Sequence, residues 1–288
     1  MRRSRRRDRS ARAELTHYIC VTCATQFAAR EEPPEKCPIC DDERQYVGHE
    51  GQRWTTLEEL RQTHRARIEE IESALVGVGM EPKFAIGQRA LLVEDILWDC
   101  VPLVDQTIAA AVEARGGITT VAISHPHYYS GMVEWAELFD ARIVLHEADQ
   151  EWVMRPSDRV EFWSGDRLAL SRTLELHRLG GHFPGGTVCL WRQGAGGAGA
   201  LLGGDILQVV SDRDWVSFMW SYPNLIPLPA TEVAGIAAHV AELEFDRLYG
   251  AWWDSLVDGD AKAKVARSAA RYIDALSHPR ERSPSPLR

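Results

Sequence analysis

The sequence has no long run of apolar residues, and this absence excludes several classes of protein. No stretch approaches the roughly 18 apolar residues that a membrane-spanning helix needs. The Arg-rich first dozen residues lead into His17, Cys20 and Cys23, where a signal peptide would have its apolar segment. Internal repeats are also missing. We therefore expect a cytoplasmic globular protein that does not enter a membrane.

Charge is unevenly distributed along the 288 residues, with a net charge of −9 although seven arginines lie in residues 1–12. The remainder is therefore acidic, which argues against a dedicated nucleic-acid enzyme. Residues 1–14 are expected to be a basic disordered tail rather than a nucleic-acid arm. Residues 277–288, which contain three prolines, are expected to be a second disordered tail.

Four of the six cysteines form two Cys-x-x-Cys pairs within residues 15–54, namely Cys20, Cys23, Cys37 and Cys40. Each pair can make a tight turn that directs two thiolates at one tetrahedral ion. Two disulfides are the competing interpretation, which a reducing compartment disfavours. The segment resembles a zinc ribbon or a rubredoxin. Rubredoxins usually carry glycine after each pair, whereas Ala24 and Asp41 stand here, so we expect structural Zn²⁺ and a possible protein partner docking on this segment.

The rest of the chain predicts a connector followed by an α/β domain. Thr55, Thr56 and Glu59 have the spacing of a helix N-terminal capping box, so we expect a linker helix within residues 55–78 that runs to about Glu72. From 79 to 276, short apolar runs at 90–93, 119–123 and 143–146 alternate with helical patterns at 107–113 and 132–139. A strand-dense stretch at 159–210 and helices near 233–244 and 261–276 complete the domain.

Histidines follow one of these predicted strands and recur at a later glycine-rich turn. His125 and His127 lie at i and i+2 after the strand ending near Ile123, and His182 stands between Gly-Gly and Phe-Pro-Gly-Gly. Asp205 follows Gly203-Gly204. Alone, His-x-His is a weak signal for a metal site, but these residues together indicate one.

This order of residues resembles the metallo-β-lactamase superfamily over about residues 83–272. The resemblance implies a four-layer αββα sandwich preceded by the small zinc ribbon. It also implies that His125, His127 and His182 bind the first metal, that Asp205 is the bridging carboxylate, and that Asp99 orients a ligand.

Three departures from the family pattern remove the ligands of its second metal. Tyr129 and Ser130 stand where the family has Asp and His, and Ala251 stands near the place of its final His. We therefore expect one ion in the histidine site, Zn²⁺ or else Fe or Mn.

Other candidate residues are expected to be structural. His146, His177 and His239 fit satisfied or surface histidines, and Cys100 fits a buried inert thiol. The aromatic stretch 215–223 could equally fill the core or wall a substrate pocket, and the resemblance favours the pocket.

The resulting functional hypothesis is a metal-dependent hydrolase. A mononuclear metal-bound hydroxide would attack an ester, lactone, thioester or amide of a small-molecule substrate, with Asp205 orienting the water and Tyr128 or Tyr129 donating to the oxyanion. The alternatives are a mononuclear iron redox enzyme and a non-catalytic metal-binding scaffold.

Overall fold

A computed structural model describes residues 15–277 of the chain. The predicted tails at 1–14 and 278–288 lie outside the described residues. Ser277, which we expected in the second tail, is instead the last residue of helix α6 (Ala261–Ser277).

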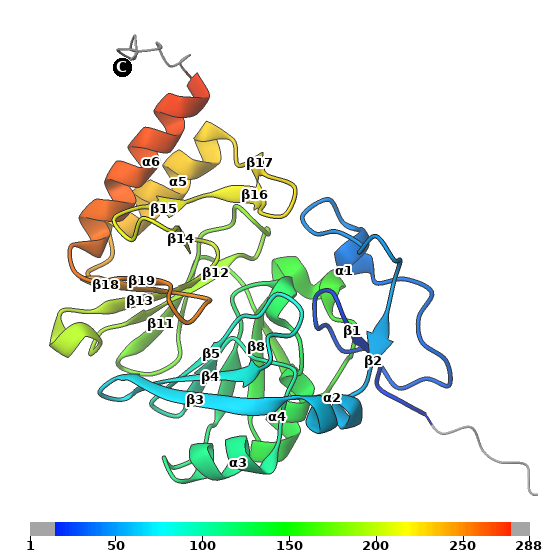
Figure 1. The fold of residues 1–288 in the computed structure, drawn as a ribbon. Helices are drawn as coiled ribbons and strands as arrows, with labels where there is room; N and C mark the ends of the chain where they lie inside the picture. The colour runs from blue at the N-terminus through cyan, green and yellow to red at the C-terminus, as the bar shows by residue number, and fades with distance from the viewer. Residues whose placement is uncertain (1–14, 278–288) are drawn as a thin grey trace, which may run out of the picture.

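Two mixed β-sheets form the centre of the molecule (Figure 1). The first has seven strands in sequence order: β3 (Arg65–Glu72), β4 (Leu75–Glu81), β5 (Ala90–Val93), β6 (Ile96–Trp98), β7 (Thr120–Ala122), β8 (Arg142–His146) and β9 (Val160–Trp163). The second has six, in the order β10 (Arg167–Ala169), β11 (Leu174–Arg178), β12 (Thr187–Trp191), β13 (Ala200–Gly204), β18 (Arg247–Gly250) and β19 (Leu256–Val257). Strands β6 to β9 run parallel, as does the pair β13 and β18.

Helices cover the outer face of each sheet, which completes four layers. Strand β5 shows the division, because Leu91 and Val93 face the core between the sheets while Ala90 and Leu92 face the helix side. Helices α3 (Gln106–Glu113) and α4 (Met132–Phe139) pack on the first sheet, and α5 (Ala230–Ala241) and α6 pack on the second. This αββα sandwich confirms the predicted fold class.

The four-cysteine segment, residues 15–54, is here called the cysteine knuckle. It contains the paired strands β1 (Ile19–Cys20) and β2 (Trp54–Thr55) and the one-turn helix α1 (Pro38–Asp41). In Figure 1 it lies at one side of the sandwich, beside the loop that carries β16 (Met219–Ser221) and β17 (Ile226–Pro227). The short pair β14 (Gln208–Val209) and β15 (Val216–Ser217) lies just before that loop.

The predicted linker helix is wrong over most of its length. Helix α2 (Leu57–Thr63) begins with the expected capping box, in which Thr56 accepts from the Glu59 amide and Glu59 from that of Thr56. The helix ends at Thr63, and Arg65–Glu72 is an edge strand paired with β4. Ala66 and Ile68 pack on the core cluster beneath the sheet. Pairing with the apolar strand β4 therefore overrides the helix propensity of the Arg and Glu residues.

Membrane crossing can be tested only on the described residues. Within 15–277, no helix is both long enough and apolar enough to cross a bilayer.

Candidate metal centre

Three histidines and one aspartate meet at the ends of strands from both sheets. His125 and His127 follow β7, with His125 just before the 3₁₀ turn η1 (Pro126–Tyr128) and His127 within it. His182 lies in the turn between β11 and β12, and Asp205 follows β13. One ligand atom from each residue lies within 4.8 Å of the others, and all four residues are buried. The structure thus brings together every ligand that the sequence predicted for this site.

A chain of hydrogen bonds determines which nitrogen of His125 faces the centre. The buried Asp99 carboxylate accepts from the Ser124 amide and from its hydroxyl, both at 2.8 Å. Because the hydroxyl hydrogen is used in this way, the Ser124 oxygen accepts from Nδ1 of His125 at 2.9 Å. Nε2 of His125 therefore carries a lone pair. Asp99 thus acts through Ser124, a residue the sequence did not single out.

That lone pair faces a carboxylate oxygen. Nε2 of His125 lies 3.2 Å from Oδ1 of Asp205, and neither buried atom has a hydrogen-bond partner in the described part of the chain. Burial lowers the pKa of His125 well below its usual value and raises that of Asp205 to about 7. Two acceptors this close need a proton or a metal ion between them, and the two further imidazoles of the cluster favour a metal ion.

His182 is oriented in the same sense. Nδ1 of His182 donates to the carbonyl of Trp220 at 2.7 Å, which leaves Nε2 as a lone pair 3.1 Å from Nδ1 of His127. Ligands about 2.0 to 2.1 Å from a tetrahedral Zn²⁺ are separated by roughly 3.3 Å. The separations of 3.1 and 3.2 Å fit such an ion, so the donor set suits Zn²⁺ or a similar divalent metal.

Two features, one of the backbone and one of a distant side chain, let these ligands converge. Gly204 has a φ of +55°, and a Cβ there would lie 2.8 Å from the Ser124 hydroxyl, so only glycine lets Asp205 approach Ser124. The turn that holds His182 is tied down by Asp149, whose carboxylate accepts from the Gly185 amide at 2.8 Å. Sequence reasoning missed Asp149, since no local pattern connects it to a turn more than thirty residues away.

The two tyrosines predicted to assist catalysis lie in different places. The ring of Tyr128 lies 4.5 Å from that of His125, and burial together with the Asp205 charge raises its pKa well above the usual value. Tyr129 shares with Tyr128 the core between the first sheet and its helices, and burial followed by the Asp149 charge raises its pKa well above the usual value. The ring contact with His125 therefore places Tyr128 at the cluster.

No second ion-binding group lies beside the first within residues 15–277. The groups of three or more metal-type side chains there are the four cysteines and the histidine cluster. Ser130 is buried without a partner for its hydroxyl in that part of the chain, and Ala251 uses its carbonyl to accept from the Arg89 amide. That the histidine cluster holds one ion rather than two stays a prediction.

The four cysteines form a compact thiol cluster. Sγ of Cys20 lies 3.5 Å from that of Cys40, and Sγ of Cys23 lies 3.6 Å from that of Cys37. A tetrahedral Zn²⁺ with bonds of about 2.3 Å separates its sulfurs by about 3.8 Å. Gln52 donates to Cys20 Sγ at 3.1 Å, as expected for an amide near a thiolate. The cluster fits a metal without rearrangement.

The cysteine knuckle docks directly beside the histidine cluster. Arg44 inserts its guanidinium 3.9 Å from the ring centroid of Phe183 and 4.7 Å from that of Trp220. The Arg44 carbonyl accepts from the Ser221 hydroxyl at 3.2 Å, and Asn224 donates to the carbonyls of Glu43 and Gln45 at 2.9 Å. The aromatic stretch at 215–223 is thus partly the surface on which the knuckle sits.

Some residues of the aromatic stretch 215–223 fill the core and others line a cavity. Phe218 is fully buried in the core of the second sheet, whereas Tyr222 lines a cavity of about 240 Å³ that also exposes His127, His182 and Asp205. The Tyr222 hydroxyl donates to the Asp205 carbonyl at 2.6 Å. Tyr222 is a residue of the site that the sequence named only as part of an aromatic run.

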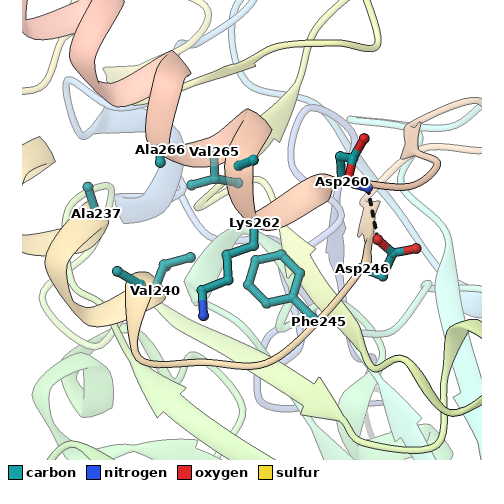
Figure 2. A pocket seen from close by; sticks show the side chains of 10 residues that line it. Ala237, Val240, Phe245, Asp246, Asp260, Lys262, Val265 and Ala266 are labelled. Atoms are coloured by element: carbon teal, nitrogen blue, oxygen red, sulfur yellow. Dashed lines mark hydrogen bonds between the residues drawn. The ribbon is translucent and has the colours of Figure 1, made fainter.

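The remaining candidates contact other residues of the chain, and their structural role stays a prediction. His146 bonds the Ala148 amide and the Gly165 carbonyl, and His177 contacts His239 at 3.2 Å. The Cys100 thiol donates to the Tyr128 carbonyl. Figure 2 shows another cavity, of about 420 Å³ between α5 and α6, whose lining is mainly apolar and whose Lys262 pairs with Glu244. In the same cavity the Asp246 carboxylate accepts from the Asp260 amide at 2.9 Å.

Comparison with solved structures shows the fold. The fold is that of the metallo-β-lactamases. A B3 metallo-β-lactamase with an active-site glutamic acid matches with a TM-score of 0.50 and 15% identity, over 78% of this chain and 97% of that one. A metallo-β-lactamase from Cronobacter sakazakii matches with 0.50 and 18%, over 74% and 96%. The crystal structure of VMB-1 matches with 0.54 and 13%, over 74% and 98%.

A sequence relative then defines the family. The chain is 50% identical over 269 residues to the "Uncharacterized protein YmaE" of Bacillus subtilis (strain 168), with 91% of this chain and 98% of that protein covered. The chain belongs to the same family as YmaE. No family model matches the sequence.

Proposed function

We propose that this protein is a hydrolase that uses one metal ion to cleave an ester, lactone, thioester or amide of a small molecule. The observation that carries the proposal is the buried cluster of three imidazoles and the Asp205 carboxylate, in which His125 Nε2 and Asp205 Oδ1 lie 3.2 Å apart without a hydrogen-bond partner in the described part of the chain, as suits a shared metal ion. The likeness to metallo-β-lactamases supports the fold alone, whereas the residues of the site support the function.

His125, His127, His182 and Asp205 would hold the ion. A divalent metal bound there would lower the pKa of a coordinated water from its bulk value toward about 7 and would polarise a carbonyl oxygen. In the overall reaction the water oxygen bonds to the carbonyl carbon, the bond to the leaving oxygen, sulfur or nitrogen breaks, and the leaving group takes up a proton.

The chain's own groups orient this chemistry. Asp99 and Ser124 hold the His125 tautomer, and the Trp220 carbonyl holds that of His182. Tyr128, buried beside Asp205, stays protonated and can donate to its carboxylate. The cavity above the cluster admits the substrate at the edge formed by His127 and His182.

The cysteine knuckle would bind a structural Zn²⁺. Its four thiols must stay reduced to do so, and we therefore expect the protein to work in a reducing compartment. Because the knuckle docks beside the histidine cluster, it has a structural role within its own chain in addition to binding any partner protein.

Metal analysis combined with a substrate panel tests the proposal. Purified protein should hold close to two metal ions per chain. His127→Ala should keep the knuckle zinc, lose the second ion and lose turnover of esters, lactones, thioesters and amides. His49→Ala, which changes an exposed histidine outside both clusters, is the matched control.

The result that overturns the proposal is equally specific. A wild type that holds both ions, turns over no member of the panel and equals His127→Ala throughout would indicate a metal-binding scaffold. Iron in the histidine site with oxygen-dependent turnover would move the protein to redox chemistry instead.

A further inference from the structure

The cavity beside the histidine cluster is built partly by the cysteine knuckle. Thr22, Gln45 and Tyr46 of the knuckle line it together with His127, His182 and Asp205. Lys83, in the connection between β4 and β5, lines it as well. The pocket is therefore incomplete without the knuckle, whose position is set by the bonds from Ser221 and Asn224.

Lys83 differs from the other lysines of the chain. The sequence contains four, and Lys36, Lys262 and Lys264 each pair with a carboxylate at 2.7 Å. Lys83 makes no ion pair or hydrogen bond with any described residue, although the chain as a whole is acidic. Its aliphatic stem packs over Gly87, where any larger side chain would collide with it. Lys83 is exposed to solvent and unpaired, so its ammonium is free to bind an anionic ligand that enters the cavity it lines with Asp205.

Two amides at the same cavity also lack partners. Gln45 is only 5% exposed, yet its side chain makes no hydrogen bond within residues 15–277. The Oε1 atom of Gln208 is buried and has no partner in that part of the chain. Buried amides normally find partners, so these two are available to a polar ligand.

We propose that the knuckle and Lys83 select the substrate, a small acyl compound that carries a carboxylate a few bonds from the carbonyl to be cleaved. One ammonium balances one negative charge, and no arginine or helix N-terminus lines the cavity to suit a phosphate dianion. Gln45 supplies a hydrogen bond from the knuckle side. The volume of about 240 Å³ limits the acyl group to a short chain. This inference rests on the proposed hydrolase function.

The test compares two esters that differ in one charge. Metal-loaded protein is assayed with the mono-4-nitrophenyl ester of glutaric acid and with 4-nitrophenyl pentanoate, which has the same number of acyl carbons. Wild type should favour the glutarate ester at least about fivefold in kcat/KM. Lys83→Met should remove that preference through KM alone, and Gln45→Ala should raise KM for both esters. Lys36→Met, which changes an exposed lysine of the knuckle, should leave the preference unchanged.

A binding measurement separates failure of the inference from failure of the proposed function. Calorimetry with glutarate and with pentanoate should show tighter binding of glutarate to wild type and loss of this difference in Lys83→Met. Equal turnover of both esters, or a preference that Lys83→Met leaves intact, overturns the inference while the hydrolase stands. Lys83-dependent glutarate binding without turnover of either ester overturns the hydrolase while the anion site stands. Neither binding nor turnover overturns both.

Discussion

Replacing Arg44 with alanine should weaken both the protein and its histidine site. The Arg44 side chain is almost fully buried, and its guanidinium lies among the rings of Phe183, Trp220 and Trp152 at 3.9, 4.7 and 5.2 Å. Its Nε and Nη2 atoms donate to the Asp42 carboxylate at 2.6 and 3.0 Å. The residue thus joins the knuckle to the turn that holds His182.

The size of the effect follows from these contacts. A desolvated cation–π contact contributes roughly 0.5 to 2 kcal/mol, and a partly buried ion pair about 1 kcal/mol. Since neighbouring contributions are not additive, we expect Arg44→Ala to lower the free energy of unfolding by about 2 to 4 kcal/mol. Arg44→Lys keeps the charge but loses the planar guanidinium, so it should lower the free energy of unfolding by about half as much.

Urea unfolding of the metal-loaded protein measures the stability, and hydrogen exchange of the amides at 180–186 measures the local effect. Arg67→Ala is the matched control, because Arg67 also stacks on a tryptophan, Trp253 at 4.1 Å, but lies on the edge strand β3. Arg67→Ala should reduce stability without changing exchange at 180–186. A loss below about 0.5 kcal/mol in Arg44→Ala with unchanged exchange would refute the reasoning.

Three further results are expected. Cys37→Ser should lower the zinc content by about one ion per chain while the histidine site keeps its own, as measured by elemental analysis. Asp99→Asn should weaken metal binding at the histidine site roughly 10- to 100-fold in a chelator competition, since the Ser124 link to His125 is disturbed. Burial raises the pKa of Asp149 to about 6, against about 3.9 in the unfolded chain. Because the folded protein binds this proton more tightly, the contribution of Asp149 to the free energy of unfolding falls as the pH rises from about 4 to about 6. Asp149→Asn keeps an acceptor for the Gly185 amide and should remove that pH dependence. The difference in the free energy of unfolding between the variant and wild type, measured in urea, should therefore favour the variant by at least about 1 kcal/mol more at pH 7 than at pH 4.

Both metal-type clusters could be predicted from the sequence because their ligands sit in short motifs. Cys-x-x-Cys and His-x-His each carry their own geometry, and His182 and Asp205 follow in the order typical of one known fold. The alternation of apolar runs and helical patterns indicated the sandwich for the same reason. The prediction of a helix through Glu72 was wrong because Arg65–Glu72 is half exposed and has the composition of a helix. The local sequence does not reveal that this segment pairs with β4.

Only the tertiary structure decided how the cysteine knuckle and the histidine cluster meet. Arg44 reaches Phe183, Asp149 reaches Gly185, and Lys83 shares a cavity with Gln45, and none of these contacts follows from spacing in the chain. Local sequence determines conformations over a few residues, through periodicity, capping and turn geometry. Contacts between distant segments depend on how complete surfaces pack, so a knuckle that the sequence presented as a separate module is, in the folded protein, one wall of the pocket.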